Sequence, residues 1–397
     1  MSEFILGKTA KCNSAMVFSK FTSQPLWKYL GLIFIITALV ISSYYAVVAG
    51  WTLEYLYMSI TDQFSGKSSS DFQPLFDNFT SNPYRSLVCT LAIFIITHFI
   101  VSRGVRQGIE KYSKVLMPTL FMAIIVLVIC SVSLEGASEG INFLLHPDFT
   151  KIDSHITIDA LGQAFYSLSL GMGCLITYAS YFNKDTNLTK TGINVCIIDT
   201  VVAVMAGFII FPAMFNAGHG ISPEDVGPSL IFITLPNIFQ ECFSSVPIIG
   251  YLFAVLFFFL LLVSAITSLI SLHEVITSFI TEKYSASRRR AAIIVTSSYI
   301  SLGILCALSF GLLKDFTIAG MTIFSLFDFL SSNVLLPFGG LATSVFVGWV
   351  IDKKFQYHYL TYTSKARTWF FFFIRFMIRY VVPFGIGFIL IHQFGFL

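Results

Sequence analysis

The sequence predicts an all-α integral membrane protein, and three observations support this fold class. Charged residues make up only 11% of the 397 residues, against about 25% in an ordinary soluble domain. Hydrophobic residues make up 56%, and 43 residues are Phe. Apolar runs of about 20 residues, enough to span a bilayer, recur along the whole chain. Together these features exclude a cytosolic enzyme, a nucleic-acid binder and a disordered chain.

The apolar runs predict about nine complete transmembrane helices in one domain that covers residues 1–397. Segments longer than 30 residues indicate tilt, kinks or helix that extends beyond the bilayer. Breakers such as Asn82-Pro83 bound the segments. In chain order the segments are 28–58, 84–102, 116–133, 157–182, 190–215, 247–281, 291–312, 317–351 and 379–396.

The distribution of charge predicts the orientation of these helices. When the N-terminus is placed in the cytoplasm, the inner loops hold nearly all of the basic residues, as the positive-inside rule requires. The sequence therefore predicts a multi-pass protein of a plasma membrane. We expect the lipid bilayer to be one of its partners and expect no nucleic-acid partner. Of the 24 Lys and Arg residues, those outside the inner loops are Lys67, Arg85, Lys151 and Lys314.

Five acidic residues lie within the apolar segments, where an ionisable group needs a partner or a water-filled site. Glu54 and Asp159 lie near the outer ends of their segments, so solvation there explains them. Glu274 is as compatible with a local structural hydrogen bond as with function. Asp199 and Asp328 lie deep in apolar sequence, which favours ion coordination over a structural polar contact.

Small and polar residues interrupt the segment 157–182 at Ser167, Ser169, Gly171 and Gly173. One interpretation is a small-residue packing face between helices. The other is a broken helix, whose freed backbone groups meet substrate and ions near the middle of the membrane. The sequence favours neither over the other.

A third polar group consists of Ser264, Thr267 and Ser268, which share one helical face. Such hydroxyls often bond to their own backbone or to a neighbouring helix. They are also hard oxygen ligands that suit an alkali cation. No enzyme motif of the H-E-x-x-H, G-x-S-x-G or P-loop type occurs, so we expect no enzyme. An intramembrane hydrolase remains a minor hypothesis.

Motifs in a fixed order extend this pattern along the chain. They are Glu3-Phe-Ile-Leu-Gly7-Lys8, Ser43-Tyr44-Tyr45, Gly50-Trp51-Thr52, the basic stretch 103–111, Gly140-Ile-Asn-Phe143, His146-Pro147-Asp148-Phe149, the interrupted segment 162–181 and Phe232-Ile-Thr-Leu-Pro236. In this order they resemble the neurotransmitter:sodium symporter family, which has the leucine-transporter fold, an inverted-repeat helix bundle. The resemblance assigns residues 1–7 to the end of the family's second helix, 28–351 to its third to tenth helices and 379–396 to its eleventh.

The resemblance implies a symporter that couples sodium entry to amino-acid import by alternating access. It implies one sodium site at Ser167 and Asp199 and a second at Ser264, Thr267 and Ser268. It places Gln163 and Asp328 in an outer gate and Tyr181 and Glu282 in an inner gate. The implied substrate pocket, with a lid formed by Tyr166 and Tyr45, consists of Ile41, Tyr45, Tyr166, Ser169, Met172, Ser268 and Leu272.

These assignments carry three expectations about chemistry. The pocket positions hold no charge, so we expect a neutral, apolar or aromatic amino acid. In chloride-dependent members of the family, a bound anion supplies a negative charge near this sodium site. Here Asp199 would supply that charge, so we expect transport to require sodium but not chloride. The loop 59–83 is short and has no Cys, unlike the disulfide-bearing loop of animal members, so we expect a prokaryotic protein of the bacterial inner membrane.

The chain also departs from the family, because Met1 falls within what would be the second helix. The family's first helix and most of the second have no counterpart here. We therefore expect the 397-residue chain, expressed as written, to insert poorly and to transport nothing. The alternative hypothesis is a transport-inactive remnant that acts only as a membrane or structural protein. The particular amino acid, the sodium stoichiometry and the oligomeric state stay open.

Overall fold

The computed structural model describes residues 1–104, 110–146, 148–216, 230–352 and 368–393. Parts of the motifs 103–111 and 146–149, and the end of the expected segment 379–396, lie outside these residues. In the described part the secondary structure is helical, and the α-helices are α1 Ser2–Ala10, α2 Pro25–Ile60, α3 Ser69–Ser81, α4 Pro83–Ser102, α5 Lys111–Val132, α6 Ala137–Leu145, α7 Ser154–Ser167, α8 Cys174–Ser180, α9 Leu188–Asn216, α10 Leu235–Cys242, α11 Pro247–Tyr284, α12 Arg288–Leu308, α13 Ile323–Phe329, α14 Leu336–Val345, α16 Thr368–Phe376 and α17 Val382–Gln393.

Four π-helical turns and two 3-10 turns complete the described elements. The π-helical turn η5 Leu330–Leu335 joins α13 to α14, and a second one, η6 Phe346–Val350, continues α14, so that these elements form one long apolar unit. A third, η7 Met377–Val381, joins α16 to α17, and the fourth, η4 Leu230–Thr234, precedes α10. The 3-10 turns are η1 Phe18–Lys20 and η3 Phe149–Lys151.

Eight helical units in the described residues are long and apolar enough to cross a membrane, which confirms the predicted all-α membrane fold. The ninth expected segment, 157–182, forms the two short helices α7 and α8 instead of one span. The eight units are Pro25–Ile60, Pro83–Ser102, Lys111–Val132, Leu188–Asn216, Pro247–Tyr284, Arg288–Leu308, Ile323–Val350 and Phe371–Ile391.

The last unit begins earlier than the expected residue 379. The expected boundary followed the charges at Arg375 and Arg379, but the helix starts at Thr368 and continues through both. Arg379 fits at this position because its guanidinium lies 4.4 Å from the ring centre of Trp349, and cation–π attraction stabilises a partly desolvated charge.

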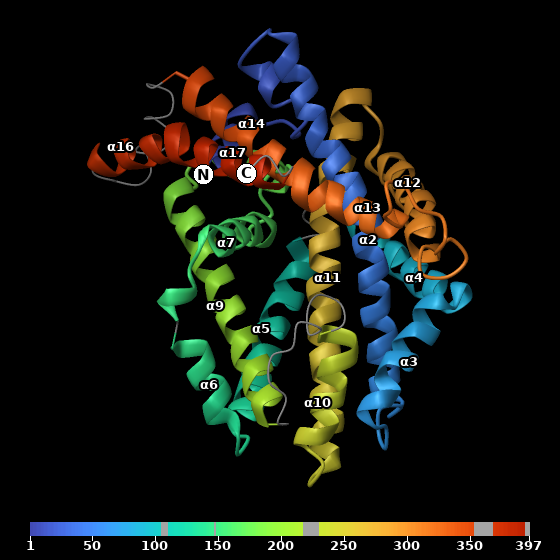
Figure 1. The fold of residues 1–397 in the computed structure, drawn as a ribbon. Coiled ribbons are helices and arrows are strands. Elements are labelled where there is room, and N and C mark those ends of the chain that lie inside the picture. Colours follow the sequence, from blue (N-terminus) through green and yellow to red (C-terminus); the bar gives the residue numbers. More distant parts are fainter. Residues whose placement is uncertain (105–109, 147, 217–229, 353–367, 394–397) are drawn as a thin grey trace.

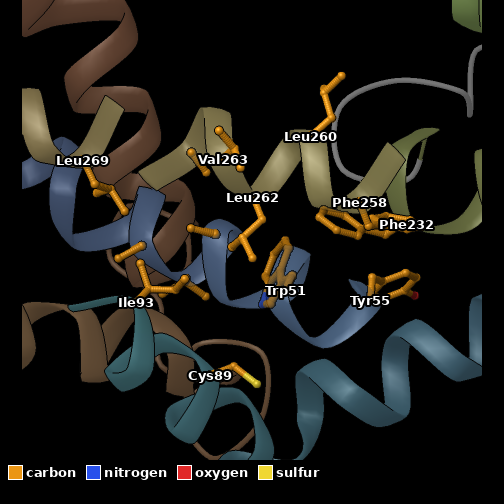
Figure 2. Packing of buried hydrophobic residues seen from close by; sticks show 14 of the residues in the cluster. Trp51, Tyr55, Cys89, Ile93, Phe232, Phe258, Leu260, Leu262, Val263 and Leu269 are labelled. Atoms are coloured by element: carbon orange, nitrogen blue, oxygen red, sulfur yellow. The ribbon is translucent and has the colours of Figure 1, made fainter. Parts of the chain in front are cut away.

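The two longest helices, α2 and α11, lie against each other and form the scaffold of the bundle (Figure 1). Figure 2 shows their aromatic packing, in which Trp51 and Tyr55 of α2 meet Phe258 of α11 and Phe232 of η4. The Tyr55 and Phe232 ring centres are 5.0 Å apart, and those of Trp51 and Phe310 are also 5.0 Å apart. Edge-to-face contacts at these distances favour one fixed arrangement of the rings.

The short helix α1 packs directly against α8, far along the chain. A Cβ atom on Gly7 would lie 2.1 Å from the carbonyl oxygen of Ile176, so only glycine permits this approach. Small residues bring helix backbones together in membrane proteins, where packing rather than water drives association. The N-terminal helix is thereby fixed beside the second half of the interrupted segment.

Glu54 differs from its expected environment. We expected solvation near the outer end of the helix, but the residue is 6% exposed. Its carboxylate forms an ion pair with Arg85 of α4 and accepts a hydrogen bond from the Cys89 thiol, with 3.4 Å between sulfur and oxygen. The expectation was wrong because an intramolecular partner, not water, neutralises the charge. The side chain of Asp159 lies outside the described part of the structure.

Candidate functional site

The site centres on residues 168–173, where the helix predicted over 157–182 is broken. Helix α7 ends at Ser167 and α8 begins at Cys174. Between them Ser169 has φ 54°, Gly171 φ 79° and Gly173 φ 77°, which are left-handed conformations that an α-helix cannot contain. The structure therefore contains the broken helix, one of the two interpretations that the sequence left open.

The break is held in place by contacts from α1 and α14. The Gly171 amide donates a hydrogen bond to the Glu3 carboxylate, with 2.8 Å between nitrogen and oxygen. A Cβ atom on Gly171 would lie 2.1 Å from the carbonyl oxygen of Leu336, and one on Gly339 would lie 2.3 Å from the Gly171 carbonyl oxygen. The small residues thus also serve close packing, and the two interpretations describe different faces of one segment.

The first predicted sodium pair is brought together at the end of α7. The Ser167 hydroxyl lies 2.7 Å from both carboxylate oxygens of Asp199, which is in the middle of α9. Ser167 has one hydroxyl hydrogen, so it donates to one of these oxygens at a time. The pair places three hard oxygen atoms in one small volume, the type of ligand that an alkali cation takes.

The second predicted set lies on α11. The Thr267 hydroxyl donates to the Ser264 carbonyl oxygen at 2.8 Å, so that carbonyl oxygen and the hydroxyl face the same side. Ser268 follows on this side, where it is exposed and lines the same cavity as Tyr45 of α2. One residue therefore belongs both to the hydroxyl set and to the edge of the predicted pocket.

All seven predicted pocket residues line one cavity of about 1800 Å³. Helix α2 contributes Ile41 and Tyr45. The remaining members come from the end of α7, the break and α11, and they are Tyr166, Ser169, Met172, Ser268 and Leu272. Ser167 and Thr267 also reach this cavity, so each predicted sodium set borders it. None of these nine side chains carries a charge.

The cavity continues from the pocket to the basic end of the bundle. Its far wall includes Arg103 at the end of α4 and Lys111 and Lys114 at the start of α5. Lys114 pairs with Glu110 at 2.7 Å. Since the charge distribution predicts this end to be cytoplasmic, the cavity joins the predicted pocket to the inner side of the membrane.

The predicted outer-gate residues lie on α13 and α7. Asp328 is exposed on α13, and its carboxylate accepts a hydrogen bond from Ser332, with 3.4 Å between the oxygens. Gln163 is exposed on α7, four residues before Ser167. Their roles as gates stay predictions.

The predicted inner-gate residues do not contact each other directly. The Tyr181 hydroxyl donates to the Glu274 carboxylate at 2.6 Å. Glu282 instead accepts hydrogen bonds from the backbone amide of Asn13 at 2.8 Å and from its side-chain amide at 2.7 Å. Glu282 thus ties α11 to the segment after α1, while Glu274 takes the position beside Tyr181.

Sequence reasoning missed the residue that neutralises Glu274. Arg288, the first residue of α12, forms an ion pair with this carboxylate, whose side chain is completely buried. The Arg288 Nε also donates to the Val101 carbonyl oxygen at the end of α4, at 3.0 Å. In the sequence Arg288 is the first of three consecutive arginines, which we placed in a predicted inner loop. The available signal was Glu274 itself, an acid in apolar sequence that needs a basic partner.

Two lysines hold the segment after α8 from the side of α1. The Lys8 ammonium donates to the Thr186 carbonyl oxygen at 2.6 Å, and Lys11 donates to the carbonyl oxygen of Phe182. Burial lowers the pKa of both lysines. The charge of Lys11 lowers the pKa of Lys8 further, and the charge of Lys184 lowers that of Lys11. Cations near the end of a helix also match its dipole.

A membrane bundle with a broken helix, two oxygen-rich clusters and a cavity between them is the arrangement of an ion-coupled secondary transporter. The comparisons with known proteins agree. The model of the sodium:neurotransmitter symporter family matches residues 75–395, and the chain belongs to this family.

Relatives and a solved structure are similar over nearly the whole chain. The uncharacterized sodium-dependent transporter YhdH of Bacillus subtilis (strain 168) is 34% identical over 398 residues, which cover 100% of this chain and 86% of the relative. An uncharacterized sodium-dependent transporter of Haemophilus influenzae is 36% identical, covering 96% and 83%. The crystal structure of MhsT in complex with L-phenylalanine matches with a TM-score of 0.87 and 36% identity, covering 99% of this chain and 87% of MhsT. The protein is thus a multi-pass, sodium-dependent membrane transporter.

Proposed function

We propose that the protein imports a neutral, apolar or aromatic amino acid together with sodium, by alternating access. The observation that carries this proposal is the convergence of seven uncharged side chains from α2, the end of α7, the break and α11 in one cavity. A cationic or dicarboxylic side chain would lose its hydration there without a charged partner, which costs several kcal/mol. The L-phenylalanine in the similar MhsT structure is consistent with such a substrate.

Within this proposal the two oxygen clusters hold sodium. Ser167 and Asp199 form one site, and Ser264, Thr267 and Ser268 contribute to the other. Sodium bound at both sites would link α7, α9 and α11 around the pocket. Entry of the cation down its gradient would then favour the conformation that binds the amino acid.

The test, like the other uptake measurements below, uses the chain extended upstream by about two helices. It measures uptake of labelled phenylalanine and leucine into proteoliposomes under an inward sodium gradient. We expect accumulation with sodium and none when potassium replaces it. Unlabelled leucine, methionine, phenylalanine and tryptophan should compete with one another, because flexible Met172 accepts several shapes. Lysine and glutamate should not compete. Preferential displacement by lysine or glutamate would contradict the proposed substrate class.

We also propose that transport does not require chloride. The Asp199 carboxylate already places a negative charge beside Ser167, so no bound chloride is needed to supply one. Replacement of chloride by gluconate should leave the sodium-driven uptake rate unchanged. A large loss of uptake in gluconate would refute this part of the proposal while leaving the sodium coupling intact.

A further inference from the structure

Two arginines near the start of the last spanning unit form no ion pair in the described part of the chain. Arg375 lies in α16 and Arg379 follows four residues later in η7, so the two charges share one side of the helix. The ion pairs of the described residues include neither arginine, and Asp352, two residues beyond η6, pairs with neither. Like charges at this spacing repel each other, so the arrangement favours an anion from outside the chain.

Burial sharpens this need for an anion. Within the described residues, Arg375 Nη1 and Arg379 Nε are buried and have no hydrogen-bond partner. Both side chains are half-buried, so their remaining N–H groups stay accessible. A charge that has lost part of its hydration at membrane depth is costly unless an opposite charge or a polar acceptor meets it.

The last unit places these groups against the lipid at the inner surface. Only 17% of the apolar window of Phe371–Ile391 is buried, against 61% in Pro247–Tyr284, so the last unit lies at the periphery of the bundle. The charge distribution predicts that its N-terminal end is cytoplasmic. Side chains on a helix lean toward the helix N-terminus. Both guanidinium groups therefore lean toward the level of the inner headgroups.

The end of the preceding unit fixes one of the two guanidinium groups. A Cβ atom on Gly348 would lie 2.9 Å from the Arg379 Cα atom, so glycine permits the close approach of η6 and η7. The Trp349 indole N–H donates to the Arg379 carbonyl oxygen at 3.0 Å, and the Arg379 guanidinium lies 4.4 Å from the Trp349 ring centre. Stacking occupies the face of the guanidinium and leaves N–H groups at its edge for an acceptor. Trp349 and Tyr380 are 55% and 37% exposed, as in the aromatic belt of a membrane interface.

We propose that Arg375 and Arg379, with Trp349 as a platform, bind the phosphate of an anionic phospholipid in the inner leaflet. Guanidinium groups hold phosphate oxygens through paired, charge-assisted hydrogen bonds, and the phosphate charge offsets the repulsion between the arginines. A lipid rather than a free anion fits, because the site lies on a helix that faces the bilayer. None of the three residues lines the amino-acid cavity, so this inference goes beyond the proposed function and does not depend on it.

The test is equilibrium binding of labelled phosphatidylglycerol to the purified, upstream-extended protein in mild detergent. Phosphatidylcholine with the same acyl chains should bind more weakly, because its headgroup has no net charge. Arg375→Gln and Arg379→Gln should each weaken phosphatidylglycerol binding about 5-fold, the factor for one arginine near an anionic surface. The double variant should bind at least as weakly as either. Arg289→Gln is the matched control, because it removes an exposed arginine that is also predicted to be cytoplasmic and should leave binding unchanged.

A second measurement, the thermal midpoint, keeps the result independent of damage to the fold. Without lipid, Arg375→Gln should not lower the midpoint, because it removes one of two repelling charges. Phosphatidylglycerol should raise the midpoint of the wild-type protein and leave that of the double variant unchanged.

Four outcomes would overturn the proposal, and none of them involves amino-acid uptake. The first is equal phosphatidylglycerol binding by the wild-type protein and both glutamine variants. The second is equal binding of phosphatidylcholine. The third is a fall in the lipid-free midpoint of Arg375→Gln, which would reveal a partner within the protein. The fourth is displacement of the labelled lipid by millimolar inorganic phosphate, which would indicate a site for a free anion.

Discussion

The scaffold helices and the broken segment 157–182 are both predominantly apolar, but only the scaffold helices are continuous. Helices α2 and α11 continue without interruption for 36 and 38 residues, and aromatic rings fix their contact. Residues 168–173 leave the helical conformation, and their backbone meets groups from other elements, such as Glu3. Irregular backbone is tolerated at membrane depth only where protein or a cavity surrounds it. The scaffold therefore positions the helices, and the break supplies polar groups to the cavity.

One buried ion pair joins the scaffold helix α11 to α12, and its loss is the largest effect we predict. Arg288→Ala would leave the Glu274 carboxylate buried without its charged partner, although Tyr181 would still donate to it. Breaking a buried pair in this way costs about 3–5 kcal/mol. We expect a clear fall in the thermal midpoint of the purified protein and weaker sodium-driven uptake.

Two variants make this prediction specific. Arg289→Ala removes the next arginine, which is exposed, and should leave the midpoint unchanged. The double variant Arg288→Ala with Glu274→Gln should recover part of the stability, because it no longer buries an unpaired charge. If Arg288→Ala and Arg289→Ala behave alike, the ion pair does not stabilise the packing of α12 against the scaffold helix α11.

The next prediction concerns the break itself. Gly171→Ala forces a side chain into a left-handed conformation, at about 1–2 kcal/mol, and places its Cβ against the Leu336 carbonyl. We expect sodium-dependent amino-acid binding to weaken by at least about 10-fold. Gly162→Ala is the matched control, since a Cβ there meets no atom within 4 Å. Equal affinities of the two variants, measured by radioligand binding, would show that the break tolerates displacement.

The smallest effect is expected in the scaffold. Trp51 is 1% exposed, and among the described residues its indole nitrogen has no hydrogen-bond partner. Trp51→Phe keeps an aromatic ring among Phe76, Phe232 and Phe310 and loses no hydrogen bond there. We expect a loss of less than about 1.5 kcal/mol in unfolding free energy and an unchanged sodium dependence of uptake. A change in sodium dependence would mean that the scaffold shapes the ion sites directly.

Much of this architecture could be predicted from the sequence. Long apolar segments identified the spans, because hydropathy reflects a requirement that every spanning helix shares. Small residues at Gly171 and Gly173 indicated a discontinuity without deciding between a packing face and a break. The positive φ angles decide it, and these depend on contacts with Glu3 and Leu336 from distant parts of the chain.

Pairings of charged residues were the least predictable part of the site. Asp199 stood out because it lies deep in apolar sequence, whereas its contact with Ser167 requires α7 and α9 to meet. Tyr181 reaches Glu274 rather than Glu282, and Glu54 finds Arg85 rather than water. In each case the sequence identifies a buried acid, but tertiary packing selects its partner.

The most direct test of the account is the sodium dependence of uptake in Asp199→Ala. The substitution removes the only acidic side chain of the predicted sodium clusters and leaves Ser167 without the carboxylate that lies 2.7 Å from its hydroxyl. Thr200→Ala on the same helix is the control, because that hydroxyl bonds only to its own helix at the Cys196 carbonyl oxygen. Initial rates of labelled amino-acid uptake into proteoliposomes should rise with external sodium in wild-type protein and in Thr200→Ala. In Asp199→Ala they should stay at the sodium-free level. Wild-type sodium dependence in Asp199→Ala would contradict the central claim that this carboxylate holds the coupled cation.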